Sequence, residues 1–125
     1  MSRAAPGAPP GWPAEVPPPD VPGWEQRATG WLFDLCPADL RAHEVLRRHP
    51  LALAYVADAQ VSAALAAVLD SLSGARAALR EALPPAAVSE VVVALQGERG
   101  RLEAAALAVP LVREALAGVR RAPRL

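Results

Sequence analysis

Two long stretches with helical periodicity, residues 51 to 83 and 86 to 121, are joined by the dipeptide Pro84-Pro85. Neither proline has a backbone N–H to donate, and Pro85 disfavours the helical conformation at Pro84, so one helix cannot run through this point. Proline is well tolerated in the first turn of a helix, so a second helix can begin there. The sequence therefore predicts an all-α protein built on a long antiparallel, coiled-coil-like helical hairpin.

Each arm of this hairpin carries apolar residues at alternating steps of three and four, the spacing of a coiled coil. In the first arm the set is Leu51, Ala54, Asp58, Val61, Leu65, Val68, Leu72, Ala75, Leu79 and Ala82. In the second arm it is Val88, Val92, Leu95, Arg99, Leu102, Ala106, Val109, Val112, Leu116 and Val119. These two sets are called the hairpin seam below. Pro110 lies within the second arm and removes one helical hydrogen bond, so we expect a kink there.

Charged residues interrupt the seam, and hairpin symmetry indicates what each one meets. If the arms reverse about Pro84-Pro85, Arg99 lies near Asp70, and Asp58 lies near Val112 or Arg113. If these side chains are buried, opposite charges neutralise one another in pairs, and any other register is costly because it buries each charge alone. At the edge of the seam they reach water instead.

Two shorter helices are expected before the hairpin. The first covers about residues 24–35, with Trp24, Trp31 and Leu35 on one face. The second covers about residues 38–48, between Cys36-Pro37 and the break at His49-Pro50. We expect one or both to pack on the hairpin, and the aromatic face of the first is a candidate interaction face.

Residues 1–22 are rich in proline and poor in residues that can form a core. They hold eight of the fourteen prolines, namely Pro6, Pro9, Pro10, Pro13, Pro17, Pro18, Pro19 and Pro22. Such a composition predicts a disordered tail, followed by a single helical domain over residues 23–122.

Side chains that could take part in catalysis or metal binding gather between residues 31 and 50, but they match no known catalytic pattern. One cysteine and two histidines lack the paired spacing of a zinc site, and no glycine-rich phosphate loop is present. We therefore expect no enzyme activity, metal or cofactor. The first residues lack the apolar core of a secretion signal, and charges interrupt every apolar run, so we expect a cytoplasmic protein without a membrane span.

The stretch CPADLRAHEVLRRHPLALA, which follows a segment rich in tryptophan and leucine and precedes the alanine-rich hairpin, carries a resemblance. It resembles an uncharacterised conserved hypothetical protein family of high-GC actinobacteria, over about residues 22 to 120. The resemblance implies a bacterial cytoplasmic setting and supplies no catalytic residue or ligand.

An arginine-rich pole is predicted at the end of the hairpin opposite the connection. Its members are Arg41, Arg47, Arg48, His49, Arg120, Arg121 and Arg124. One interpretation is an anion-binding site for nucleic acid or an acidic partner. The other is that arginines near helix ends complement the helix dipole.

Two helices leave wide alanine and valine surfaces outside a single seam, such as Ala63, Ala64, Ala67, Val91, Val93, Ala104 and Ala105. The leading hypothesis is therefore an interaction or scaffold module that acts through helix pairing, with itself as a dimer or with another helical protein. The alternative is an anion-binding module that uses the arginine-rich pole, with nucleic acid as the weaker candidate ligand.

Overall fold

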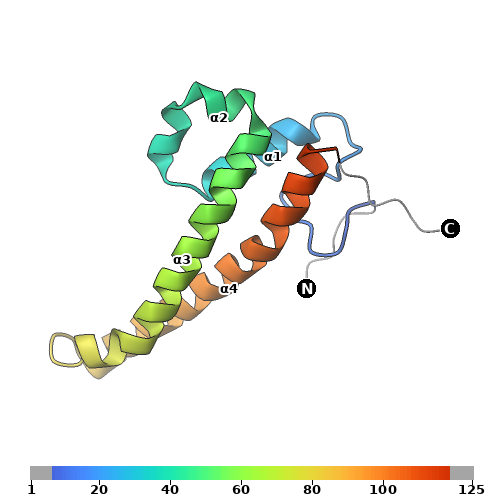
Figure 1. The fold of residues 1–125 in the computed structure, drawn as a ribbon. Coiled ribbons are helices and arrows are strands. Elements are labelled where there is room, and N and C mark those ends of the chain that lie inside the picture. Colours follow the sequence, from blue (N-terminus) through green and yellow to red (C-terminus); the bar gives the residue numbers. More distant parts are fainter. Residues whose placement is uncertain (1–6, 119–125) are drawn as a thin grey trace.

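The computed structural model describes residues 7–118, and it forms the predicted all-α hairpin. Its elements are α1 (Trp24–Asp34), the 3₁₀-helix η1 (Ala38–Ala42), α2 (Glu44–Arg48), α3 (Pro50–Leu79) and α4 (Pro85–Leu116). The two long helices α3 and α4 run antiparallel beside each other, and the short helices pack at the end far from their connection (Figure 1). No strand occurs within the described residues.

Proline sets the starts of both long helices. Pro50 and Pro85 occupy the first turns of α3 and α4, where a missing N–H costs no helical bond. The predicted helix over 38–48 is instead divided at His43, whose extended backbone (φ −91°, ψ 101°) separates η1 from α2. The first long helix ends at Leu79 rather than 83, and α4 continues through Pro110 to Leu116.

The hairpin seam packs largely as predicted. Its buried members are Ala54, Val61, Ala75, Val88, Val92, Leu102, Val109 and Val112. Leu51, with 44% of its surface exposed, and Ala82, exposed beyond the end of α3, depart from the prediction, and Val119 lies outside the described residues. The seam therefore holds the two arms together over most of their length.

One of the two expected charge contacts across the seam forms. The Arg113 Nη1 and Asp58 Oδ2 atoms lie 3.7 Å apart. Arg99 instead pairs with Glu103 one turn further along α4, at 3.3 Å, while Asp70 is exposed. Arg99 and Asp70 thus reach water at the edge of the seam, where a charge needs no partner across the hairpin.

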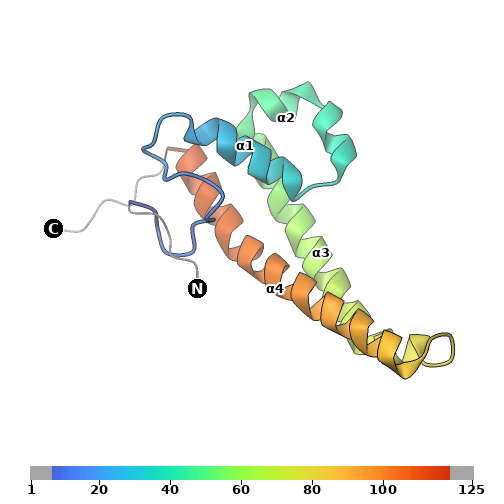
Figure 2. The same cartoon turned by 180° about the vertical axis from the view of Figure 1, so that it is seen from behind.

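The structure differs from the predicted disorder over residues 7–22. Trp12 and Val16 are buried in the core, and the Trp12 indole N–H donates a 2.8 Å hydrogen bond to the Val16 carbonyl oxygen. The Trp12 and Trp24 ring centroids lie 5.9 Å apart. Successive turns, closed by N–H groups bonded to proline carbonyl oxygens, shape this segment, which lies beside α4 (Figure 2). Prolines restrict the unfolded chain, so ordering it costs less entropy than composition suggests.

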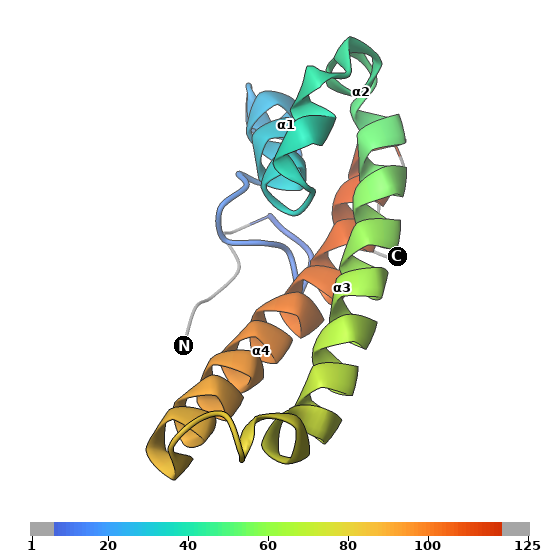
Figure 3. The ribbon, with the colours of Figure 1, turned by 90° about the vertical axis from the view of Figure 1, so that its left-hand side faces the viewer.

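The main core lies on one side of the hairpin, where α1 and the N-terminal segment pack (Figure 3). Ala28, Leu32 and Phe33 of α1 are buried there. They join Leu53 and Ala57 of α3 in a single buried cluster. Ala105 and Ala108 of α4 are buried on this same side, which we call the covered face.

Candidate interaction surface

The opposite side of the hairpin carries a second stripe on each arm. The buried residues of the covered face directly precede seam residues, and a rotation of about 100° per residue places those that directly follow the seam on the other side. Because the arms are antiparallel, this rotation turns both stripes toward the same side. The residues are Tyr55, Ala59, Ser62, Ala66, Leu69 and Ser73 of α3, with Val93, Gln96, Gly100, Glu103, Leu107 and Pro110 of α4, and all are exposed. We call this surface the open face.

Contacts between the arms confirm that the two stripes share a side. The guanidinium of Arg113, which also follows a seam residue, lies 5.4 Å from the centroid of the Tyr55 ring. The same Arg113 pairs with Asp58. Residues of α3 and α4 therefore meet on the open face at its end nearest the short helices.

The open face exposes large apolar side chains without net charge. The exposed fraction is 70% for Leu107, 65% for Val93 and 64% for Tyr55. The one ionised side chain among its members, Glu103, is paired with Arg99. Exposed apolar surface of this extent is typical of interaction sites in soluble proteins.

Helix α3 is unusually apolar for its degree of burial. It contains an 18-residue window with a mean hydropathy of 1.6, of which 22% is buried. By length and composition alone, α3 thus falls in the range of a membrane-spanning helix. No such helix is expected from the sequence, because charged residues interrupt its apolar runs. Within the fold, this apolarity lies mostly outside the core.

Two hollows border these faces. One, of about 850 Å³, lies at the end of the open face between Leu51 and Tyr55 of α3 and Pro110 and Arg113 of α4. The other, of about 750 Å³, lies on the covered face between Trp12, Trp31 and Ala108. Arg101 lines the rim of the second hollow and bonds Glu98, which holds the pKa of that carboxyl below its usual range. Within the described residues, every buried side-chain nitrogen and oxygen atom has a partner, so neither hollow presents a buried polar group awaiting a ligand.

The predicted aromatic face of α1 points into the protein. Trp24 is 9% exposed and packs on Trp12, while Trp31 and Leu35 are partly buried against the same core. This face therefore contacts the chain's own hairpin and N-terminal segment. Only parts of Trp31 and Leu35 remain accessible to another molecule.

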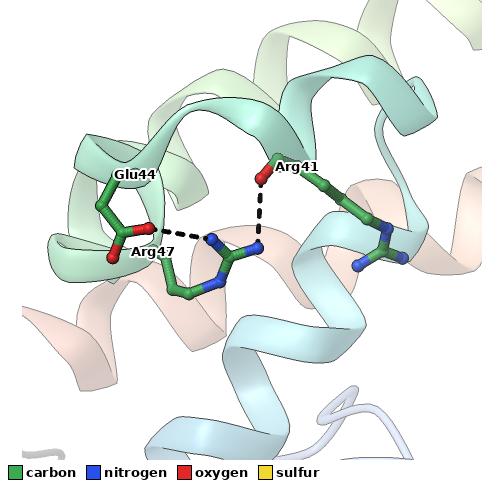
Figure 4. A network of polar contacts seen from close by, with 3 residues as sticks. All are labelled: Arg41, Glu44 and Arg47. Atoms are coloured by element: carbon green, nitrogen blue, oxygen red, sulfur yellow. Dashed lines mark hydrogen bonds and ion pairs between the residues drawn. The ribbon is translucent and has the colours of Figure 1, made fainter.

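Two of the predicted pole arginines form a local network instead of an open cluster. Arg47 donates to the Glu44 carboxylate at 3.2 Å and to the Arg41 carbonyl oxygen at 3.1 Å (Figure 4). Arg41 in turn bonds Asp34 at 2.5 Å. Both guanidinium groups lie over the Phe33 ring, at 5.3 and 5.5 Å from its centroid.

This network fastens η1 and α2 to the end of α1. Sequence reasoning did not identify Phe33 as the platform, because its ring falls beside the main apolar stripe of α1. Arg48 and His49 are exposed at the junction of α2 and α3. Arg120, Arg121 and Arg124 lie outside the described residues, so the second half of the predicted pole has no structural account.

Cys36 follows α1 and lies partly buried against the core. Burial raises the pKa of its thiol, and the nearby Arg41 charge offsets only part of this effect. A raised pKa lowers the fraction of thiolate, which is the reactive form. Cys36 thus has the environment of a packing residue.

Comparisons with protein-family models, with curated proteins and with solved structures found no match for this chain.

Proposed function

We propose that this protein is a non-enzymatic helical interaction module, a scaffold that acts through helix pairing and associates with itself. The observation that supports this function is the open face, which exposes Tyr55, Leu69, Val93 and Leu107 in one largely apolar strip. Covering such a surface stabilises a complex by about 25 cal/mol per Å² of apolar area removed from water.

Alanine, serine and glycine make up much of the remaining strip, which lowers the entropic cost of pairing. Ala59, Ala66 and Gly100 have no side-chain rotamers to lose when another helix packs on them. A Cβ atom added at Gly100 meets no atom within 4 Å, so a neighbouring helix has room to approach there. Small residues of this kind allow close contact between helix backbones.

The alternative, an anion-binding module at the arginine-rich pole, has weaker support. Arg41 and Arg47 already carry carboxylate partners and lie over Phe33. An anion has to compete with Asp34 and Glu44 for them. Arg48 and His49 remain exposed, but two neighbouring side chains on a short helix junction do not form an enclosed site.

The mass in solution, measured by sedimentation or light scattering at micromolar concentration, tests the proposal. We expect a dimer with twice the chain mass of 13.0 kDa. Its dissociation constant should change little between low and high salt, because apolar contacts are not screened. A clean monomer across the whole concentration range contradicts self-association. Binding of a short nucleic acid that weakens steeply with salt points instead to the pole.

A further inference from the structure

We propose that the open face is the surface on which a second copy of this chain packs, so that two hairpins form a four-helix bundle about a two-fold axis. This inference rests on the proposed function and assigns it a surface and a partner. In either two-fold arrangement of two hairpins packed face to face, the helices that meet across the interface run antiparallel. Their dipoles then oppose one another favourably.

The dimensions of the open face fit a second hairpin. From Tyr55 to Ser73 it runs 18 residues, about 27 Å at about 1.5 Å per residue. Two helices with axes about 9 Å apart make it about 20 Å wide. The projected area is therefore about 540 Å² on one copy and about 1,100 Å² on two, before allowing for protruding side chains. This approaches the lower bound of about 1,200 Å² for specific interfaces.

A partner of another shape fits less well. A single helix, about 10 Å in width, spans only about half of the width of the strip, so it buries less of the open face than a second hairpin does. A second hairpin covers both arms at once. The same pattern of steps along both stripes also provides matching knobs and holes in a second copy.

Charge and access favour a second copy as well. Over the residues named above the open face has no net charge, since Glu103 is paired with Arg99 and Arg113 with Asp58, while the exposed Arg76 continues the α3 stripe beyond Ser73 and adds a positive charge at that end. It therefore does not repel its own duplicate, and it offers no net charge to select an acidic or basic partner. The short helices and the N-terminal segment lie on the covered face, so they do not obstruct the approach (Figure 3).

A lipid surface is the competing occupant suggested by the apolarity of α3. Insertion of the open face into hydrocarbon removes the Arg99–Glu103 pair from water, together with Gln96 and two serines. Transferring such groups without new hydrogen-bond partners is costly. A second hairpin instead supplies polar side chains of its own that can pair with these groups, which hydrocarbon does not.

Leu107→Glu provides the test, with Val45→Glu as its matched control. Leu107 is 70% exposed on the open face, whereas Val45 is 50% exposed on α2, outside the hairpin. Both variants gain the same charge at an exposed apolar position, so the monomer fold should tolerate either one. We expect Leu107→Glu to raise the dimer dissociation constant at least tenfold, because two-fold symmetry places a new charge in the interface twice. Val45→Glu should leave it unchanged.

A thiol-labelling measurement covers the case in which Leu107→Glu fails to fold. Ala66→Cys, in a Cys36→Ser background, puts the only thiol of the chain in the middle of the open face. Its labelling by a bulky maleimide should be protected at high protein concentration and released on dilution. The same substitution at the exposed Ala38 should be labelled equally at both concentrations.

The outcomes separate the two proposals. If the wild-type protein is a dimer but neither Leu107→Glu nor Ala66→Cys responds, the open face is the wrong surface while self-association stands. If the wild-type protein is a monomer, both proposals fail. If it is a monomer that binds lipid vesicles, and Leu107→Glu abolishes that binding, a membrane occupies the open face instead of a second copy.

Discussion

Removing the Trp12 side chain should strongly destabilise the protein, although this residue belongs to a proline-rich segment without regular secondary structure. Trp12 is 5% exposed, packs on Trp24 and donates its indole hydrogen bond to Val16. A buried tryptophan removes about 200 Å² from water, which corresponds to an upper bound of about 5 kcal/mol. The hydrogen bond adds about 1 kcal/mol.

We therefore expect Trp12→Ala to lower the free energy of unfolding by about 3 to 4 kcal/mol, within the range seen for aromatic truncation in cores. This loss of stability cannot exceed the free energy with which residues 7–22 dock on the helices. A substitution that detaches the whole segment removes only that docking free energy. Trp12→Phe keeps most of the ring burial and loses the indole N–H. It should cost only about 1 kcal/mol.

Urea denaturation followed by far-UV circular dichroism measures these differences. All variants need the same protein concentration, because the stability of a self-associating chain depends on it. Glu15→Ala, at an exposed position of the same segment, is the control and should lie within about 0.5 kcal/mol of wild type. A Trp12→Ala protein as stable as that control would show that the N-terminal segment is not docked.

Two further predictions concern charge and the thiol. A double-mutant cycle of Asp58→Ala with Arg113→Ala should give a coupling energy of about 0.5 kcal/mol, as expected for a half-exposed pair. The matched cycle of Asp70→Ala with Arg99→Ala should be additive, and equal couplings in the two cycles would contradict the observed pairing. Alkylation of Cys36 by iodoacetamide should be slower in the folded protein than in urea at mildly alkaline pH, because burial raises its pKa. Arg41→Gln should slow it further, since the Arg41 charge lowers that pKa, and an unchanged or faster reaction would contradict this.

The hairpin was predictable because it depends on local physics. Pro84-Pro85 prevents a continuous helix whatever surrounds it, and the steps of three and four along both arms define one buried stripe on each. The register followed from symmetry about the prolines closely enough to bring Asp58 to Arg113. It did not bring Arg99 to Asp70, because an arginine at the edge of a seam can reach Glu103 on its own helix at less entropic cost.

The candidate surface was only partly visible in the sequence. Alanine and valine outside the seam indicated uncovered area, and Val93 and Ala104 are indeed exposed. Ala105 is buried, because α1 and the N-terminal segment pack on that side. Periodicity shows that a helix has several apolar stripes, but it does not show which of them another part of the chain will cover.

The position of the N-terminal segment and the identity of the open face were decided by tertiary structure alone. A count of prolines predicts disorder, yet Trp12, Val16 and two of the prolines are buried, and prolines reduce the entropy that the segment loses when it docks. Packing between separate elements also turned Trp24 inward and placed the exposed Arg41 and Arg47 over the Phe33 ring. Local sequence sets where helices begin and end, through backbone constraints. Which apolar surfaces remain in water depends on contacts between residues far apart in the chain, and these contacts follow no pattern of spacing.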